Sequence, residues 1–148
     1  MKVAPIRFKM IASSYPFYVQ DGKLLLSLRA NTGYADGMYS LPAGHVEDGE
    51  TLTMCIIREA KEEIGVTIDV RDIVLVHTMH RNENDIRMDF FFEVKKWSGI
   101  PVNCEPEKCG GLAWFPIDSL PENTVPYVRA AIEMWQKGII FSERGWEI

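Results

Sequence analysis

The stretch from Gly44 to Val66 constrains this chain of 148 residues more than any other. It reads GHVEDGETLTMCIIREAKEEIGV, with a glycine loop at its start and acidic residues towards its end. Apolar residues recur at three- and four-residue spacings from Leu52 to Ile64, which predicts a helix, and Gly65 is placed to end it. The rest of the chain must therefore support a loop that leads directly into a short charged helix.

Three glutamates, Glu59, Glu62 and Glu63, fall together on one arc of the predicted helix, because residues three and four apart are neighbours on a helix surface. Like charges at this spacing repel, and the dipole of the helix disfavours anions in its last turn. A bound cation explains such a cluster. Carboxylates, together with a backbone carbonyl at the Ala43–Gly44 turn, favour Mg²⁺ or Mn²⁺ over zinc. Taken alone, the three glutamates are also typical of a solvated helix face.

Composition excludes several other classes of protein. The formal net charge of −5 argues against broad binding of nucleic acid, which relies on a basic surface. The three cysteines, Cys55, Cys104 and Cys109, contain no C-x-x-C pair, so we expect neither a zinc site nor a disulfide framework. Charges or proline interrupt every apolar run near the N-terminus, which is typical of neither a signal peptide nor a membrane span. We expect a cytoplasmic protein with no membrane partner and no stable nucleic-acid partner.

The hydrophobic pattern predicts an α/β or α+β fold, in which a mixed sheet lies between helices. The length suits a single domain over residues 1–148. A polar turn is expected at residues 80–85, between two strands that form a hairpin. The predicted strands cover residues 6–14, 17–20, 23–29, 38–43, 67–79, 87–95 and 112–115, and the predicted helices cover 52–64 and 125–137.

From Gly44 the sequence matches, without a gap, the pattern G-x5-E-x7-R-E-U-x-E-E-x-G-U, in which U is aliphatic. With this pattern the chain resembles the Nudix hydrolases, and within them a MutT-like, bacterial-type branch. The resemblance extends to residues 38–43, to the segment 97–115 with its EPEKC run, and to WFPIDSLPEN before the last helix. The matched places are filled by Gly44, Glu50, Arg58, Glu59, Ala60, Glu62, Glu63, Gly65 and Val66, of which only Ala60 is small for its aliphatic place.

The resemblance implies a Nudix-type αβα sandwich and Mg²⁺-dependent hydrolysis of a nucleoside diphosphate linked to another moiety. Arg58 would act with the catalytic group by orienting a glutamate through bidentate pairing. Glu50 and Gly65 would be structural, with Glu50 bracing the junction between loop and helix. The implied metal ligands are the carbonyl of Gly44 and the carboxylates of Glu59, Glu62 and Glu63.

The general base that activates water varies within this family. One choice lies on the helix, at Glu59 or Glu63. The other lies in the late loop, at Glu107 or Glu105, and among the four we slightly favour Glu107. A glutamate in a loop is also commonly plain surface charge.

Three residues are candidates for contact with substrate. Asn123 resembles the asparagine with which the 8-oxo-dGTP sanitising enzymes read a purine edge, although asparagine is also common in turns and helix caps. Tyr34 can face a ligand from its loop, and it is equally well explained as a half-buried loop aromatic. Glu105 is the third candidate.

The leading hypothesis is a pyrophosphohydrolase that converts a nucleoside triphosphate, or an oxidised deoxynucleoside triphosphate, to the monophosphate and pyrophosphate. Alternative substrates are nucleotide sugars, ADP-ribose and dinucleoside polyphosphates. Two hypotheses from other classes are a diphosphate isomerase and a non-catalytic nucleotide-sensing module on the same fold. The isomerase would need a catalytic cysteine and histidine ligands that the sequence does not obviously supply. Many relatives are dimers, so a homodimer is one expected assembly.

Overall fold

The computed structural model describes residues 3–147. Within these residues, seven strands form one mixed sheet in the order β3-β2-β1-β5-β4-β7, and β6 pairs with β2 outside this path. The strands are β1 (Ile11–Gln20), β2 (Lys23–Arg29), β3 (Tyr39–Ser40), β4 (Ile73–Glu83), β5 (Asp85–Val94), β6 (Cys109–Pro116) and β7 (Phe141–Arg144). The helices are α1 (Leu52–Glu59), its continuation η1 (Ala60–Ile64), the short η2 (Val70–Asp72) and α2 (Pro126–Gln136).

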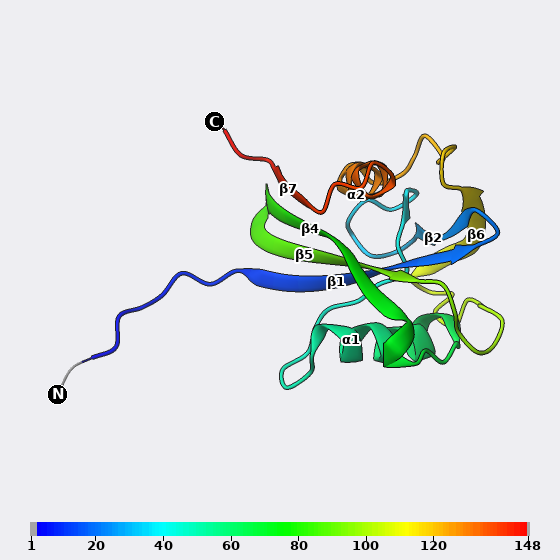
Figure 1. Ribbon diagram of the computed structural model, residues 1–148, viewed down its shortest axis with the longest axis horizontal. Helices are drawn as coiled ribbons and strands as arrows, with labels where there is room; N and C mark the ends of the chain where they lie inside the picture. Colours follow the sequence, from blue (N-terminus) through cyan, green and yellow to red (C-terminus); the bar gives the residue numbers. More distant parts are fainter. Residues whose placement is uncertain (1–2, 148) are drawn as a thin grey trace.

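The helices α1 and α2 cover opposite faces of the sheet (Figure 1). Successive side chains of a strand point to opposite faces, so each inner strand supplies two cores. In β1, Phe17 packs into the core beneath α2, and Tyr18 packs into the core beneath α1. In β2, Leu24 and Leu26 pack into the core beneath α2, and Leu25 packs into the core beneath α1. The predicted mixed sheet between helices is confirmed.

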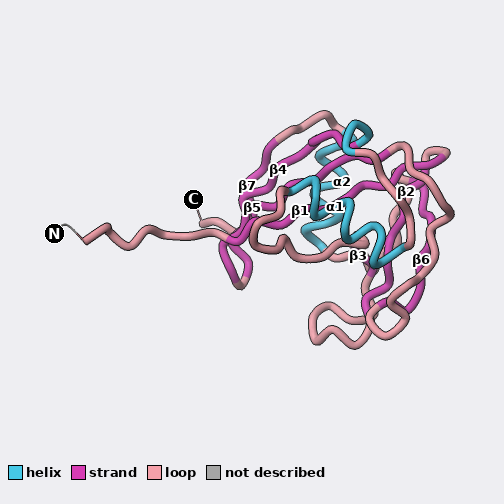
Figure 2. The backbone as a smooth tube through the Cα atoms, turned by 90° about the horizontal axis from the view of Figure 1, so that it is seen from below, coloured by secondary structure: helices cyan, strands magenta, loops and turns pink. Residues whose placement is uncertain are grey.

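The boundaries of β1 and β3 differ from the prediction. Residues 6–10 are not part of a strand; β1 begins at Ile11, where pairing with β5 starts opposite Arg87, and it continues unbroken through Gln20. Residues 3–10 extend away from the body of the protein (Figure 2). Only Tyr39 and Ser40 of the predicted strand 38–43 pair in the sheet, consistent with the missing N–H of Pro42.

The hairpin of β4 and β5 also differs. The turn predicted at residues 80–85 is wrong, because the two strands stay paired as far as Glu83 and Asp85. Asn84 alone makes the turn, with φ of 66°. The strand predicted at residue 67 begins only at residue 73. The cause is Asp69, whose side chain accepts a hydrogen bond from the backbone N of Arg71 (2.9 Å) and starts η2.

The C-terminal segment packs back on the sheet. Strand β7 runs parallel to β4, with Phe141 opposite Thr78. The indole Nε1 of Trp146 donates a hydrogen bond to the carbonyl O of His80 (3.1 Å). In the described part of the chain, no helix has the length and apolar character needed to cross a membrane.

Candidate active site

The loop and helix that begin at Gly44 are fixed by local caps. The hydroxyl of Thr51 accepts a hydrogen bond from the backbone N of Met54 (3.1 Å), which caps the start of α1. Gly65 ends the helix with φ of 71°, in the left-handed region that glycine tolerates. The predicted helix over residues 52–64 is confirmed, but its last turn, Ala60–Ile64, is a π-helix. Such turns are rare and occur frequently at functional sites.

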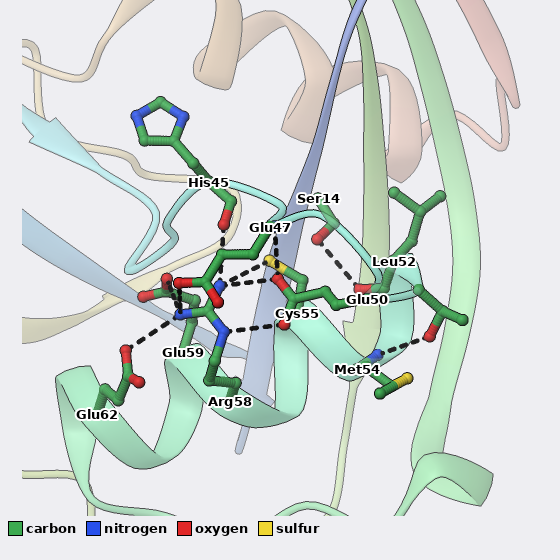
Figure 3. Close-up of polar contacts among 11 residues, drawn as sticks. Ser14, His45, Glu47, Glu50, Leu52, Met54, Cys55, Arg58, Glu59 and Glu62 are labelled. Carbon is green, nitrogen blue, oxygen red and sulfur yellow. Dashed lines mark hydrogen bonds and ion pairs between the residues drawn. The ribbon is translucent and has the colours of Figure 1, made fainter.

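Arg58 lies at the centre of the acidic residues (Figure 3). Its Nε and Nη2 donate to the two carboxylate oxygens of Glu50, over 2.9 and 2.8 Å. Its Nη1 donates to Glu59 (2.7 Å) and to Glu62 (3.1 Å). Its Nη2 also donates to the carbonyl O of His45 (2.9 Å), which ties the glycine loop to the helix. One guanidinium thus offsets the repulsion among the carboxylates around it.

These contacts shift the pKa values of Glu50 and Arg58 in opposite directions. Hydrogen bonds from Arg58 lower the pKa of the Glu50 carboxyl to about 2, and a hydrogen bond from the backbone N of Glu47 acts in the same direction. The same pairing raises the pKa of Arg58. Both groups therefore remain charged at neutral pH, as expected for residues that brace the loop against the helix.

Glu63 lies in a different environment from Glu50. Burial raises the pKa of the Glu63 carboxyl well above its usual range, and its hydrogen bond with Glu59 and the charges of Glu59 and Glu105 act in the same direction. Two carboxylates this close share a proton unless a cation lies between them. The pair is therefore a natural position for a positive charge.

The backbone approaches this pair at Gly44. A Cβ at this position would collide with the carboxylate of Glu59, so glycine lets the loop lie this close without displacing that side chain. Any other residue at the start of the pattern would therefore displace the Glu59 carboxylate from its place beside Glu63.

A cavity of about 620 Å³, hereafter the acidic cavity, opens beside the helix. Glu105 lines it from the late loop, with Lys108 and Cys109 from the same region. The helix contributes Arg58, Glu59, Glu62 and Glu63, and the glycine loop contributes Gly44. Glu107 is not among the lining residues; it is exposed, and its carbonyl O accepts a hydrogen bond from Asn31 (2.9 Å).

A second cavity, of about 340 Å³, adjoins the acidic cavity and shares Arg29, Ala43 and Gly44 with it. Tyr34 lines this second cavity, and the guanidinium of Arg29 lies over its ring, 5.3 Å from the centroid. Asn123 lines neither cavity. Its Nδ2 donates to the carbonyl O of Gly37 (3.0 Å), which links the loop before α2 to the loop before β3.

The donors suit a hard divalent cation that the substrate also binds. Within residues 3–147, no three Asp, Glu, His or Cys side chains are grouped so that they alone could hold a metal ion. Glu59 and Glu63 are within hydrogen-bonding reach, whereas Glu62 is turned towards Arg58. Mg²⁺ takes only one or two protein carboxylates and completes its coordination with water and substrate phosphates. The residues present therefore fit Mg²⁺.

The buried Arg81 and Asp89, near the second cavity, were not among the residues expected at the site. Their Nε and Oδ2 atoms are 2.7 Å apart, and Arg81 lines the cavity. The two-residue alternation of side chains along β4 could have indicated that Arg81 points inward. Arg81 shares a face of the strand with His77 and Met79, and all three are buried. In the same way, Asp89 shares a face of β5 with Phe91. A charged residue at an inward position of each of two paired strands indicates an internal ion pair.

The sequence matches the family model described as NUDIX domain over residues 9–135. The chain belongs to the Nudix hydrolase family. The predicted family is therefore confirmed. Nudix hydrolases generally use divalent metals such as Mg²⁺.

The relatives of this Nudix chain carry several different names. The NAD-capped RNA hydrolase NudC of Chromobacterium violaceum is 32% identical over 121 residues, which cover 82% of this chain and 44% of that protein. The ADP-ribose pyrophosphatase of Methanocaldococcus jannaschii is 39% identical over 59 residues, covering 40% of this chain and 34% of that protein. The chain spans less than half the length of these curated relatives.

Among solved structures, the MutT NUDIX hydrolase from Burkholderia pseudomallei superposes with a TM-score of 0.77 at 25% identity. The match covers 85% of this Nudix chain and 98% of that one. The shared fold agrees with the layers and the mixed sheet described above.

Proposed function

We propose that this chain is a Mg²⁺-dependent pyrophosphohydrolase that cleaves a nucleoside diphosphate linked to a second moiety. The observation that carries the proposal is the pair Glu59 and Glu63, held against Gly44 in a cavity large enough for a small ligand. A pyrophosphate group brings several negative charges to a site whose protein groups are themselves mostly acidic. Such a ligand enters only together with a cation.

Glu59, Glu63 and the carbonyl of Gly44 would hold the metal, with Glu62 as a further ligand once it turns from Arg58. When bound, Mg²⁺ neutralises charge on the phosphate oxygens. Arg58 keeps Glu59 in position through the 2.7 Å hydrogen bond from its Nη1. Glu50 in turn fixes Arg58 through two hydrogen bonds. The matching positions in the family pattern support these roles.

The general base is proposed to be Glu105, with Glu63 as the second candidate. Glu105 lines the acidic cavity and lies close enough to Glu63 for its charge to act on the Glu63 carboxyl. A base must reach the attacking water directly or through one further water. Glu107, which the sequence slightly favoured, lies outside the lining of the cavity and is the weaker choice.

The proposed substrate is a nucleoside or deoxynucleoside triphosphate, oxidised forms included, and the products are the monophosphate and pyrophosphate. The similarity to a MutT-named structure supports this choice. Cleavage of ADP-ribose or of an NAD cap is the second candidate, because curated relatives are named ADP-ribose pyrophosphatase and NAD-capped RNA hydrolase. The partner proposed for this chain is a small nucleotide.

The isomerase hypothesis has little support from the described histidines. Nδ1 of His77 lies 2.7 Å from the carbonyl O of Ile139, and Nε2 lies 2.8 Å from the hydroxyl of Ser142. The ring of His80 lies 4.6 Å from that of Trp146, tilted by 45°. His45 is exposed in the glycine loop and lines both cavities, but it is the one described histidine that lines the acidic cavity, whereas the isomerase would need several histidine ligands. A sensing module is distinguished from a hydrolase by turnover alone.

The test is incubation of the purified chain with Mg²⁺ and a panel of substrates, with the products separated by chromatography. The panel contains the nucleoside triphosphates, oxidised deoxynucleoside triphosphates, nucleotide sugars, ADP-ribose, NAD and dinucleoside polyphosphates. We expect monophosphate release that EDTA abolishes. Binding without turnover of any compound would favour a sensing module and overturn the proposal.

A further inference from the structure

The second cavity adjoins the acidic cavity at the glycine loop, where both are lined by Ala43 and Gly44. If the diphosphate lies beside Glu59 and Glu63, as the proposed function requires, the group attached to it extends into adjoining space. The second cavity, of about 340 Å³, is within the usual size of small-molecule sites. Its polar lining groups are therefore placed to contact that attached group.

Arg81 is the most unusual of these groups. Its side chain is only 6% exposed, its Nε is held by Asp89, and its guanidinium stacks 3.6 Å from the centroid of the Tyr127 ring. These two contacts fix the plane of the guanidinium. Neither Nη atom donates a hydrogen bond to any group within residues 3–147, and Oε1 of Glu83 is 3.8 Å from Nη1. Arg81 lines the second cavity, so this unbonded edge is available to a ligand there.

The other arginines of this cavity are bonded within the protein. Arg29 donates to the carbonyl O of Tyr34 (2.7 Å) and to the hydroxyl of Thr32 (3.0 Å). Arg87 pairs with Asp85 at 3.1 Å. Arg81 is thus distinguished by a fixed plane and two nitrogens that remain available for a planar, acceptor-rich group.

We infer that Arg81 determines specificity by donating two parallel hydrogen bonds to a nucleobase, and that the substrates are guanine nucleotides. Guanine presents O6 and N7 as adjacent acceptors, and arginine pairs with this edge bidentately. Adenine presents an amino group in place of O6, and that donor repels the guanidinium. This inference rests on the proposed function.

The same geometry predicts discrimination against oxidised guanine. In 8-oxoguanine the N7 position carries a hydrogen, so one of the two acceptors becomes a donor. The second hydrogen bond from Arg81 is then lost, because the N7–H group of the base and an N–H group of the guanidinium are both donors. The site should therefore prefer dGTP to 8-oxo-dGTP, the opposite of a sanitising enzyme.

A phosphate or carboxylate also offers two adjacent acceptors, and substrate analogues separate these sources. We would measure kcat/KM for GTP, ATP, 7-deaza-GTP, dGTP and 8-oxo-dGTP with the wild-type chain. 7-Deaza-GTP removes only the N7 acceptor, so a base contact predicts a rate about 10-fold below that of GTP. ATP should be lower by about 10-fold or more. Equal rates for GTP, ATP and 7-deaza-GTP would assign the guanidinium to a phosphate and overturn the inference.

Arg81→Lys keeps the charge and removes the planar fork. We expect the ratio of GTP to ATP rates to fall about 10-fold, while Arg87→Lys, in the same cavity, keeps the wild-type ratio. If Arg81→Lys does not fold, the double variant Arg81→Gln with Asp89→Asn removes both charges and is measured in its place. An equal fall for all substrates, with the ratio intact, would refute a role in base selection.

Binding measurements separate this inference from the proposed function. Isothermal titration with GMP and AMP requires no turnover. Tighter binding of GMP, lost in Arg81→Lys, would support the base contact even if no nucleotide were hydrolysed. Hydrolysis without any preference for guanine would uphold the proposed function and reject the role of Arg81.

Discussion

Arg58 and Glu50 are joined by two parallel hydrogen bonds, of 2.9 and 2.8 Å, across the junction between the glycine loop and α1. This geometry fixes the guanidinium plane, because a bidentate pair removes the rotation that a single hydrogen bond allows. The remaining nitrogen, Nη1, then faces Glu59 and Glu62. The pair thus places a positive charge at one side of the glutamate cluster.

Glu50→Gln should make the folded protein less stable at neutral pH. The pKa of Glu50 is about 2 in the folded chain, against about 4.3 in an unfolded one. The contribution of this carboxylate is complete above about pH 4.3 and is lost as the pH falls through about 2. Melting curves from pH 7 to pH 2 should show the wild type and the variant converging. Glu47→Gln is the control, because Glu47 is 67% exposed and 3.7 Å from Arg58; a gap that did not change with pH would contradict the prediction.

Glu63→Gln should lower kcat by orders of magnitude without loss of fold. Without a metal the raised pKa of Glu63 keeps its carboxyl protonated beside Glu59, and glutamine is neutral as well and keeps a hydrogen-bond donor, so the melting temperature in EDTA should stay nearly the same. Mg²⁺ should raise the melting temperature of the wild type, because it binds only the folded state, and should raise that of the variant less. Differential scanning fluorimetry and steady-state kinetics provide the two readouts. Full activity in the variant would show that the metal assignment is wrong.

Glu105→Gln should lower the rate and remove the acidic limb of the pH–rate profile, because that limb reports the ionisation of the base. Glu107→Gln is the matched control, because Glu107 is two residues away and outside the cavity lining, and it should leave both the rate and the acidic limb unchanged. The experiment is a kcat profile between pH 5 and pH 10 for the three proteins. A Glu105→Gln profile identical to that of the wild type would move the base to the helix, at Glu63.

Gly44→Ala should reduce activity far more than stability. The added Cβ collides with the carboxylate of Glu59, which must move away from Glu63. Gly110→Ala is a suitable control, because its Cβ would meet only the flexible side chain of Leu28, at 3.2 Å. We expect Gly44→Ala to lose at least about 10-fold in kcat/KM, a loss of about 1.4 kcal/mol of transition-state stabilisation. A fully active, folded Gly44→Ala protein would show that this close approach is unnecessary.

The sequence was informative where a property depends on local spacing. The helix and its end at Gly65 follow from neighbouring residues, as does the grouping of Glu59 with Glu63. The turn predicted at residues 80–85 was wrong because polar residues there remain in strands. Pairing of β4 with β5 holds them extended as far as Glu83 and Asp85, and only Asn84 turns. The contact from Asn123 to Gly37 spans 86 residues, and no local pattern encodes it. The single-domain organisation and the homodimer stay predictions.

The cavities could not be predicted from the sequence, because their lining also depends on contacts between residues far apart in the chain. Glu105 and Glu107 are two residues apart and chemically identical, yet only Glu105 lines the acidic cavity. The difference comes from the fold of the late loop, in which the backbone N of Glu105 bonds to the side chain of Asn103 (3.1 Å) and the carbonyl of Glu107 bonds to Asn31. Likewise, Arg81 meets Tyr127 only because β4 packs beneath α2.

The π-helical turn at Ala60–Ile64 has a consequence for protein engineering. In a regular α-helix of the same sequence, Glu63 would lie at a different angle from Glu59. The reason is that the π-helical turn is wider and changes the angle between successive side chains. Transplanting the 23-letter pattern onto an ideal helical scaffold would therefore reproduce its composition without its geometry. A designer who wished to reuse this site would have to carry over the irregular backbone together with the residues.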